Sequence, residues 1–251
     1  MLHFDLSLDQ QAIQMQDYTQ RTYAEELALL DKKISHIGGL AEYNLGQAFD
    51  ALINRDPDLA LRIIDADADI DKLQRDIEEQ VVGMISRRQP KADDLRLIIG
   101  CLKIAADLEH IGDLAKNIAK RVVVIAEQKY PRPLIAGMQN MLERALSQLK
   151  DVLDAYSERN PELALSVWRR DQSLDEAYTS VFRELLTYMM EDPRNIGFCT
   201  HMLFGAKNLE RIGDYTTNIA ETIHYVVHDE EISDVRPKGD TTSVMLFDSD
   251  Q

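Results

Sequence analysis

The chain has 251 residues, of which 45% are hydrophobic and 29% charged, with only 11 glycines and 7 prolines. This composition is typical of a helix-rich globular protein and disfavours a turn-dense β sandwich. The formal net charge of −16 at pH 7 argues against nucleic acid as a direct partner, because neutralising phosphates requires clustered Lys and Arg.

Neither a secretory signal nor a membrane span can be recognised in the sequence. No basic segment followed by an apolar stretch begins the chain, and no apolar run reaches the roughly 20 residues that a span requires. Cys101 and Cys199 lie in apolar stretches without CxxC spacing, so we expect two reduced core cysteines rather than a disulfide or a zinc site. We therefore expect a cytoplasmic protein.

Six helices are predicted by apolar residues that recur every three or four positions between proline-containing breaks. In chain order they cover about 22–54, 57–88, 93–128, 134–158, 161–191 and 195–228. The second and fifth begin at Asp56-Pro57 and Asn160-Pro161, where the polar residue is the expected N-cap and proline the first helical residue. Two apolar stripes are Ile63, Ile70, Ile77, Val81 and Met84, and Leu95, Ile98, Leu102, Ala105, Ala119 and Val123.

The chain contains an internal repeat. Residues 102–119 and 203–220, which lie 101 positions apart, are identical at 10 of 18 positions, and residues 55–61 recur at 159–165, 104 positions later. The separation falls by three because the loop before the last helix is shorter in the second half. We therefore predict an all-α fold of two tandem three-helix bundles related by pseudo-twofold symmetry. They would comprise residues 1–128 and 134–228, with a linker at 129–133 and a flexible acidic tail at 229–251.

Acidic side chains interrupt the apolar stripes at matching places in both halves. Asp67 shares a helix face with Ile63 and Ile70, and a second acid follows each first acid at i+4. Burying several carboxylates together costs several kcal/mol unless a cation compensates. Oxygen ligands at this spacing suit Mg, Ca, Mn, Fe or Zn. The candidate metal ligands are Asp67, Asp71, Glu109, Asp113 and Asn117 in the first half, and Asp171, Asp175, Glu210, Asp214 and Asn218 in the second.

Other interpretations of these charges remain open. The acids could face solvent or pair with nearby cations, among them Lys72, Arg75, Lys116 and Lys120. Glu221 and His224 have the ExxH spacing of di-iron bundles, but such sites need two of these motifs and only one is present. His110, whose counterpart is Arg211, is expected to point away from the seam as a surface histidine.

As a set, the motifs resemble the PhoU family. The resemblance rests on Leu108–Asp113 with Asn117, Leu209–Asp214 with Asn218, the pairs Asp67/Asp71 and Asp171/Asp175, and the turn Arg87–Pro90 leading to Asp94–Arg96. It implies two three-helix bundles whose E/DxxxD motifs bind iron or zinc, in some members as multinuclear clusters. His110 is a departure, because the family motif usually has Arg there.

The resemblance also implies a regulatory function without catalysis. A PhoU-like protein represses the phosphate-starvation response by connecting a phosphate ABC transporter, through its ATPase, to a membrane sensor histidine kinase. We accordingly expect peripheral association with membrane complexes and a homodimer. A di-iron-type oxidase or metallohydrolase and a metal-free helical scaffold are the alternatives.

Overall fold

The structure is a computed structural model that describes residues 8–127, 132–236, 238 and 239. Within these ranges it contains no strand, and its α-helices, in chain order, are α1 Leu8–Asn54, α2 Pro57–Arg88, α3 Ala92–Ile125, α4 Arg132–Glu158, α5 Pro161–Glu191 and α6 Ile196–His228. A short 3-10 turn, η1 Pro193–Asn195, precedes α6. The predicted all-α class is confirmed. None of the helices in the described ranges combines the length and apolar character of a membrane span.

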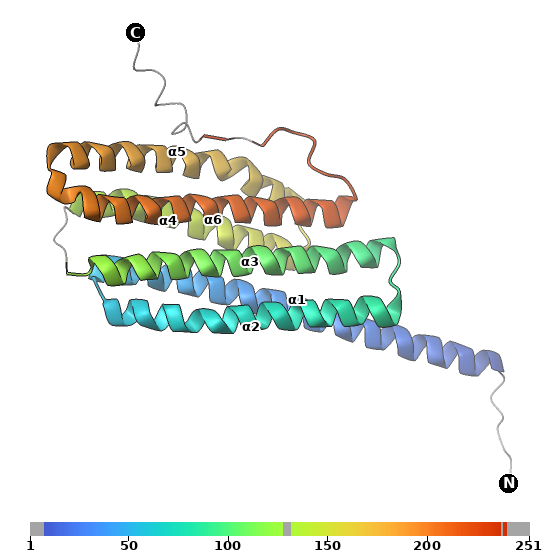
Figure 1. Ribbon diagram of the computed structural model, residues 1–251. Coiled ribbons are helices and arrows are strands. Elements are labelled where there is room, and N and C mark those ends of the chain that lie inside the picture. Colours follow the sequence, from blue (N-terminus) through green and yellow to red (C-terminus); the bar gives the residue numbers. More distant parts are fainter. Residues whose placement is uncertain (1–7, 128–131, 237, 240–251) are drawn as a thin grey trace.

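The two halves lie side by side, and the N-terminal part of α1 extends beyond the other helices (Figure 1). Helices α1, α2 and α3 pack together, as do α4, α5 and α6, and the halves meet where α3 packs on α6 and α1 on α4. Helices α2 and α5 are outermost. Each contact between the halves therefore joins a helix of the first repeat to the equivalent helix of the second. Two copies related by a twofold axis make contacts of this kind.

Most helix boundaries agree with the prediction. Helices α2 and α5 have the predicted limits, but α1 begins at Leu8 rather than near residue 22, about four turns earlier. The segment 8–22 has no glycine or proline to stop a helix. Helix α3 ends at Ile125 rather than 128, and α4 begins at Arg132 rather than 134. Most of the predicted linker lies outside the described residues.

Both predicted N-caps are confirmed. The backbone N–H of Leu59 donates to Asp56 Oδ1 at 2.9 Å, and that of Leu163 donates to Asn160 Oδ1 at 3.0 Å. Each side chain satisfies one of the donors that the start of a helix leaves without an intrahelical partner.

Removing one cap gives a modest, measurable loss of stability. We expect Asp56→Ala to lower the free energy of unfolding by about 1 kcal/mol, as measured by urea unfolding. Asp65→Ala, at an exposed position inside α2, is the matched control and should leave stability unchanged or raise it by up to about 0.7 kcal/mol, because alanine favours a helix more than aspartate does. Equal losses in the two variants would show that the cap contributes nothing specific.

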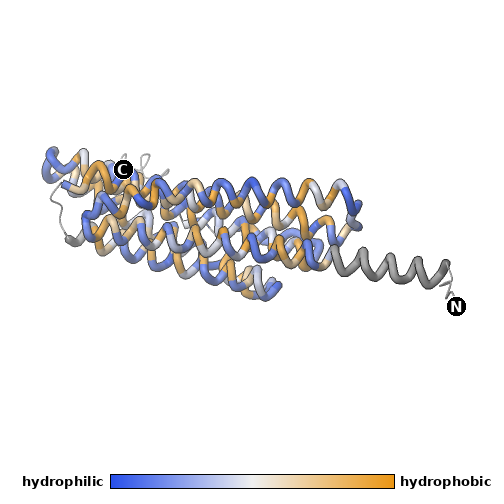
Figure 2. Tube along the Cα trace, turned by 90° about the horizontal axis from the view of Figure 1, so that it is seen from below, coloured by the Kyte–Doolittle hydropathy of each residue, from blue (hydrophilic) through white to orange (hydrophobic). Residues whose placement is uncertain are grey.

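Hydrophobic and hydrophilic residues alternate along each helix (Figure 2), and the buried ones form an almost entirely apolar core. The predicted α2 stripe is buried throughout. In α3 the stripe departs from the prediction at its ends, because Leu95 and Val123 are 37% and 38% exposed. Toward the end of α3 the buried residues are Ala119, Val122 and Ile125, each three positions after the one before. The prediction had continued from Ala119 by four positions to Val123, which therefore lies beside the buried stripe.

Helices α3 and α6 are antiparallel neighbours. A β-carbon on Gly100 would come within 2.4 Å of Val226 Cγ2, and the rings of His110 and Tyr215 lie 5.0 Å apart. Because these pairs run in opposite order along the two helices, the repeated motifs around residues 109–117 and 210–218 lie at the same level.

A partly buried polar network also joins the halves. The hydroxyl of Tyr156 in α4 donates to Asp31 Oδ1 of α1 at 2.5 Å, and Arg159 Nη2 donates to the same oxygen at 2.8 Å. Cys101 Sγ of α3 lies 3.3 Å from that hydroxyl, and burial raises the pKa of its thiol. Cys101 and Cys199 are both buried and free, as predicted.

Candidate functional site

The predicted acids gather in two groups, one between α2 and α3 and one between α5 and α6. We call Asp67, Asp71, Glu109 and Asp113 the first carboxylate cluster, and Asp171, Asp175, Glu210 and Asp214 the second. Four members are almost fully buried: Asp67 is 4% exposed, Asp171 1%, Asp175 4% and Glu210 6%. Carboxylates are rarely buried to this extent without a partner, so each cluster requires compensating positive charge.

A glycine in each motif lets the two helices of a cluster come together. A β-carbon on Gly112 would lie 2.8 Å from Ile70 Cδ1, and one on Gly213 would lie 2.6 Å from Leu174 Cδ2. The same added carbons would lie 3.7 Å from Asp67 Oδ1 and 3.3 Å from Asp171 Oδ1. The glycines therefore bring α3 and α6 close to the buried acids of the neighbouring helices.

Lys116 of α3 supplies the positive charge in the first cluster. Its ammonium donates to Asp67 Oδ2 at 2.5 Å and also to Asp113 Oδ1. Burial raises the pKa of Asp67, as do Asp71 and Asp113 nearby, although the Lys116 contact opposes this rise. Asp67 Oδ1 is buried with no hydrogen-bond partner. The lysine therefore satisfies only part of the buried carboxylate.

Glu109 pairs with the neighbouring histidine. His110 Nδ1 lies 3.0 Å from Glu109 Oε2, and burial together with the neighbouring acids raises the pKa of Glu109. The His110 side chain is 50% exposed, as expected of a surface histidine, yet its ring also packs against Tyr215 of the other half. It thus connects the first cluster to the boundary between the halves.

The second cluster takes its positive charge from a different part of the chain. Thr217 occupies the position equivalent to Lys116, and its hydroxyl donates to the Gly213 carbonyl oxygen at 3.0 Å. The compensating cation is Arg236, which follows α6. Its Nε donates to Asp171 Oδ2 at 2.9 Å and its Nη2 to Asp214 Oδ1 at 2.6 Å. Sequence reasoning missed this residue, because it lies outside both repeats.

Two further contacts complete the second cluster. The backbone N–H of Gly239 donates to Asp175 Oδ2 at 2.8 Å. Lys207 Nζ lies 2.8 Å from Glu210 Oε1, while Glu210 Oε2 is buried without a partner. As in the first cluster, one buried carboxylate oxygen remains unsatisfied.

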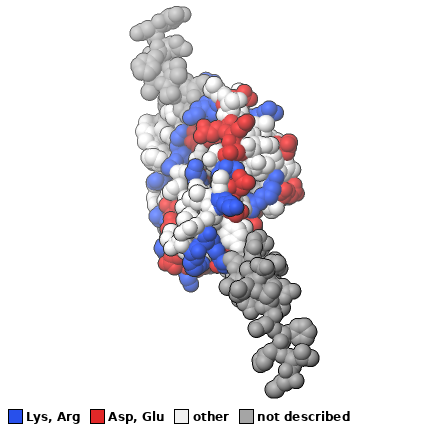
Figure 3. Space-filling view, turned by 90° about the vertical axis from the view of Figure 1, so that its right-hand side faces the viewer, with Lys and Arg blue, Asp and Glu red and all other residues white. Residues whose placement is uncertain are grey.

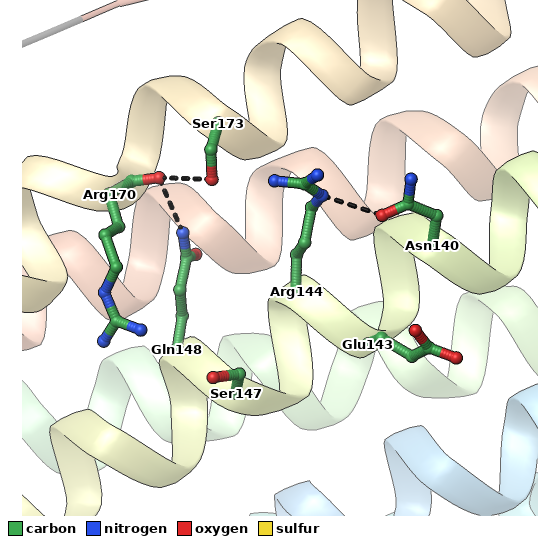
Figure 4. Close-up of a pocket in the computed structure, with 7 residues that line it drawn as sticks. All are labelled: Asn140, Glu143, Arg144, Ser147, Gln148, Arg170 and Ser173. Carbon is green, nitrogen blue, oxygen red and sulfur yellow. Dashed lines mark hydrogen bonds between the residues drawn. The ribbon is translucent and has the colours of Figure 1, made fainter.

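A buried amide, Gln148 of α4, borders the second cluster and was not predicted. It lines a groove of about 310 Å³ between α4 and α5, where its Nε2 donates to the Arg170 carbonyl oxygen at 3.1 Å (Figure 4). Its Oε1 has no partner and would lie 3.4 Å from a β-carbon on Gly213. Asn44, 104 positions earlier, is likewise buried at 4% exposure. Aligning the first helices of the two halves would have revealed this pair.

The two asparagines proposed as ligands are less buried. Asn117 is half-buried, and Asn218 lies at the boundary between the halves, where its side chain hydrogen bonds to Asp107 of α3. Burial raises the pKa of Asp107 to about 6, although His110, Asn218 and Lys103 favour its ionised form. Asp107 lies on the side of α3 that faces α6, and no role for it was predicted from the sequence.

Asp107 should make stability depend on pH. Its pKa rises from 3.8 to about 6 on folding, so its ionisation costs stability above pH 6 and this cost disappears as the pH falls toward 3.8. We expect Asp107→Asn to raise the free energy of unfolding by about 1 kcal/mol at pH 7 and to have no effect near pH 4. Urea unfolding at both pH values measures this. A variant effect independent of pH would contradict the assignment.

Among the described residues, no group of three or more His, Cys, Asp or Glu side chains is arranged to hold a metal ion. The chemistry of the clusters nevertheless fits a cation, because carboxylate and amide oxygens are ligands for hard metals. Each cluster also contains at least one buried oxygen without a partner, such as Asp67 Oδ1 and Glu210 Oε2. In their present arrangement, Lys116 and Arg236 hold the positions between the acids.

The remaining sequence motifs have structural partners. Glu221 Oε1 accepts a hydrogen bond from Trp168 Nε1 at 2.9 Å, while His224 Nδ1 lies 3.0 Å from the Glu230 carbonyl oxygen. Arg87 and Arg88, in the last turn of α2, each contact Glu26 of α1 at 3.3 Å. The ExxH residues and the arginine turn thus help hold the helices together.

The chain matches the PhoU domain family twice, over residues 34–122 and 138–223. It is 52% identical over 223 residues to a phosphate-specific transport system accessory protein PhoU homolog of Rhizobium meliloti, covering 89% of this chain and 94% of that protein. A Caulobacter vibrioides homolog with the same description is 45% identical over 91% of this chain and 100% of its own length.

Solved structures show the same fold. The crystal structure of PhoU from Pseudomonas aeruginosa superposes with a TM-score of 0.80 at 36% identity, covering 83% of this chain and all of that one. The crystal structure of the phosphate transport system regulatory protein PhoU from Streptococcus pneumoniae has a TM-score of 0.78 at 29% identity, covering 85% and 100%.

Proposed function

This chain belongs to the PhoU family of non-enzymatic accessory and regulatory proteins of phosphate transport, and we propose that it represses the phosphate-starvation response when phosphate is plentiful. The observation that supports this most is the match of both repeats, together with 52% identity to a PhoU homolog across 89% of the chain. The two matched segments, residues 34–122 and 138–223, contain both carboxylate clusters.

The proposed mechanism is that of an adaptor. The protein would contact the ATPase of a phosphate ABC transporter and a sensor histidine kinase, as a homodimer associated peripherally with these membrane complexes. At the end of the molecule where α2 leads into α3, acidic and basic side chains are interspersed (Figure 3). Such a mixed surface, on a chain of net charge −16, suits polar contacts with proteins better than contacts with nucleic acid.

We further propose that each carboxylate cluster holds metal, with Fe or Zn favoured over Mg, Mn or Ca and more than one ion per cluster allowed. Asp67, Asp71, Glu109 and Asp113 would hold it in the first half, and the four acids of the second cluster would do so in the second. When bound, a cation would neutralise the buried acids and fix α2 to α3 and α5 to α6. The unsatisfied oxygens of Asp67 and Glu210 support this proposal.

A metal-free helical scaffold is the second candidate. It is favoured by Lys116 and Arg236, which already place positive charge between the acids. Metal analysis of the purified full chain, with anomalous scattering at both clusters, distinguishes the two candidates. Metal-replete protein without density at either cluster would exclude the metal sites and leave the regulatory proposal standing.

Regulation is tested in the source organism. Deleting the gene should switch on a phosphate-starvation reporter in rich phosphate, and the wild-type gene should restore repression. The double variant Asp171→Asn/Glu210→Gln probes whether regulation needs the second cluster, with Asp65→Asn as the matched surface control. A deletion strain that still represses the reporter in rich phosphate would contradict the proposed function.

A further inference from the structure

The two carboxylate clusters receive their cations in unequal ways. Lys116 is fixed within α3, three residues from one of the acids that it contacts. Its equivalent, Thr217, is uncharged and fully buried, so α6 itself provides no cation at this position. The second cluster instead depends on Arg236, in a segment without helical structure that follows α6.

This segment follows a defined path. We call residues 229–236, 238 and 239 the C-terminal strap. It leaves the end of α6 and turns back along the second half (Figure 1). Asp229 Oδ1 lies 3.0 Å from Arg96 Nη1 of α3, the Glu230 carbonyl oxygen lies 3.0 Å from His224 Nδ1, and Ile232 packs against the hydrophobic core. The strap then reaches the second cluster at Arg236.

The end of the strap fits closely against the acids. The Arg236 side chain is 19% exposed and contacts Asp171, whose side chain is 2% exposed, so their charges are largely removed from water. A β-carbon on Gly239 would lie 2.8 Å from the Gln172 carbonyl oxygen of α5, a contact too short for any side chain. The Arg236 guanidinium thus binds the acids, and glycine at position 239 lets the backbone of the strap pack against α5.

Two buried oxygens in and beside the second cluster remain without a partner although Arg236 is in place. Glu210 Oε2 and Gln148 Oε1 belong to side chains that are 6% and 3% exposed, and both oxygens lack partners with the strap in place. A polar oxygen that is buried without a partner lowers the stability of the fold, because it has lost its hydrogen bonds to water. An ion with several oxygen ligands could satisfy both, whereas a planar guanidinium binding two other acids does not.

We propose that the C-terminal strap carries a displaceable cation, so that a metal ion enters the second carboxylate cluster only when Arg236 withdraws. This inference rests on the proposed metal sites and adds to them a control specific to the second half. The closed strap and a metal ion compete, because the Arg236 guanidinium already occupies Asp171 Oδ2 and Asp214 Oδ1, two oxygens that the metal would use as ligands. The apparent metal affinity is therefore proportional to the fraction of time that the strap is open.

The test compares Mn²⁺ binding to the full-length wild type and to variants of the strap by calorimetric titration. Arg236→Ala removes the competing charge, and Gly239→Val keeps that charge but prevents close packing of the strap. If the strap of the wild type is closed about nine-tenths of the time, both variants should bind Mn²⁺ at the second cluster about tenfold more tightly than the wild type does. Lys238→Ala, which removes an exposed charge from the same strap, is the matched control and should bind as the wild type does.

The outcomes separate the strap from the metal site. Adding Asp171→Asn to Arg236→Ala should abolish the gain, which assigns it to the second cluster. If wild type, Arg236→Ala and Gly239→Val bind Mn²⁺ equally, the strap inference is wrong and the metal proposal stands. If neither the wild type nor any variant binds Mn²⁺, the strap inference falls, while the metal proposal is decided by the metal analysis, because Fe and Zn are its favoured ions.

A readout without metal tests the role of Arg236 as counter-ion. In the presence of a chelator, Arg236→Ala should lower the melting temperature relative to Lys238→Ala, because Asp171 loses its partner. Thr217→Lys in the same Arg236→Ala background, which copies the arrangement of the first half, should restore at least half of the loss. Equal melting temperatures for Arg236→Ala and Lys238→Ala would overturn the inference.

Discussion

Replacing Lys116 with methionine is expected to lower the free energy of unfolding by about 3 kcal/mol at pH 7, because it leaves the buried Asp67 carboxylate without its partner. Methionine keeps most of the apolar stem and removes only the charge. The loss should diminish in acid. Burial already raises the pKa of Asp67 above 3.8, and losing the ammonium raises it further, so protonation at low pH relieves the unpaired charge.

Urea unfolding at pH 7 and pH 4 measures both parts of this prediction. Lys120→Met, an exposed lysine one turn further along α3, is the matched control and should cost little. Asp67→Asn in the Lys116→Met background should recover much of the lost stability at pH 7, because it removes the buried negative charge. A Lys116→Met loss that is the same at both pH values would show that packing, rather than charge, explains the effect.

The second large effect is expected where α1 meets α4. A β-carbon on Gly38 would lie 2.4 Å from Leu153 Cδ2, whereas a β-carbon on Gly39 would meet nothing within 4 Å. Gly38→Leu should therefore overpack the boundary between the halves and lower the free energy of unfolding by about 3 kcal/mol. Gly39→Leu should raise it by up to about 1 kcal/mol, because leucine stabilises an exposed helix position relative to glycine.

These adjacent glycines make a controlled pair, since the substitution, the helix and the sequence context are shared. Thermal or urea unfolding of the two variants measures the difference. If both glycines tolerate leucine equally well, α1 and α4 do not approach as closely as the structure indicates. Because the chain contains two PhoU domains, the domains could unfold separately, and the melting curves should be checked for more than one transition.

The sequence predicts the helices well where local signals are strong. Asp56-Pro57 and Asn160-Pro161 mark helix starts because proline and a capping oxygen act within one turn. The start of α1 was missed, because residues 8–22 contain no glycine or proline that would mark a helix boundary. Val123 was wrongly predicted to be buried, because the next buried residue on a helix face can lie three or four positions further on. Only the packing of the helices decides between the two spacings.

The candidate site could be predicted only in part. The repeat and the helical spacing identify all eight acids, because their positions relative to the buried stripes are encoded within each helix. Arg236 could not be found in this way, since its contact with Asp171 spans 65 residues and belongs to no periodic pattern. The rise of the Asp107 pKa likewise depends on how α3 faces α6, which no single-helix pattern specifies.

The two buried cysteines can report on local opening of this molecule through the rates at which a reagent labels their thiols. Cys101 lies beneath Tyr156 at the junction of the two halves, so a thiol reagent can reach it only after the halves separate locally. Cys199 is buried near the start of α6, within the second half, and reports on opening there. Labelling of Cys101 that is much faster than that of Cys199 would indicate that the halves separate while each stays folded. Equal rates would indicate that the halves unfold together.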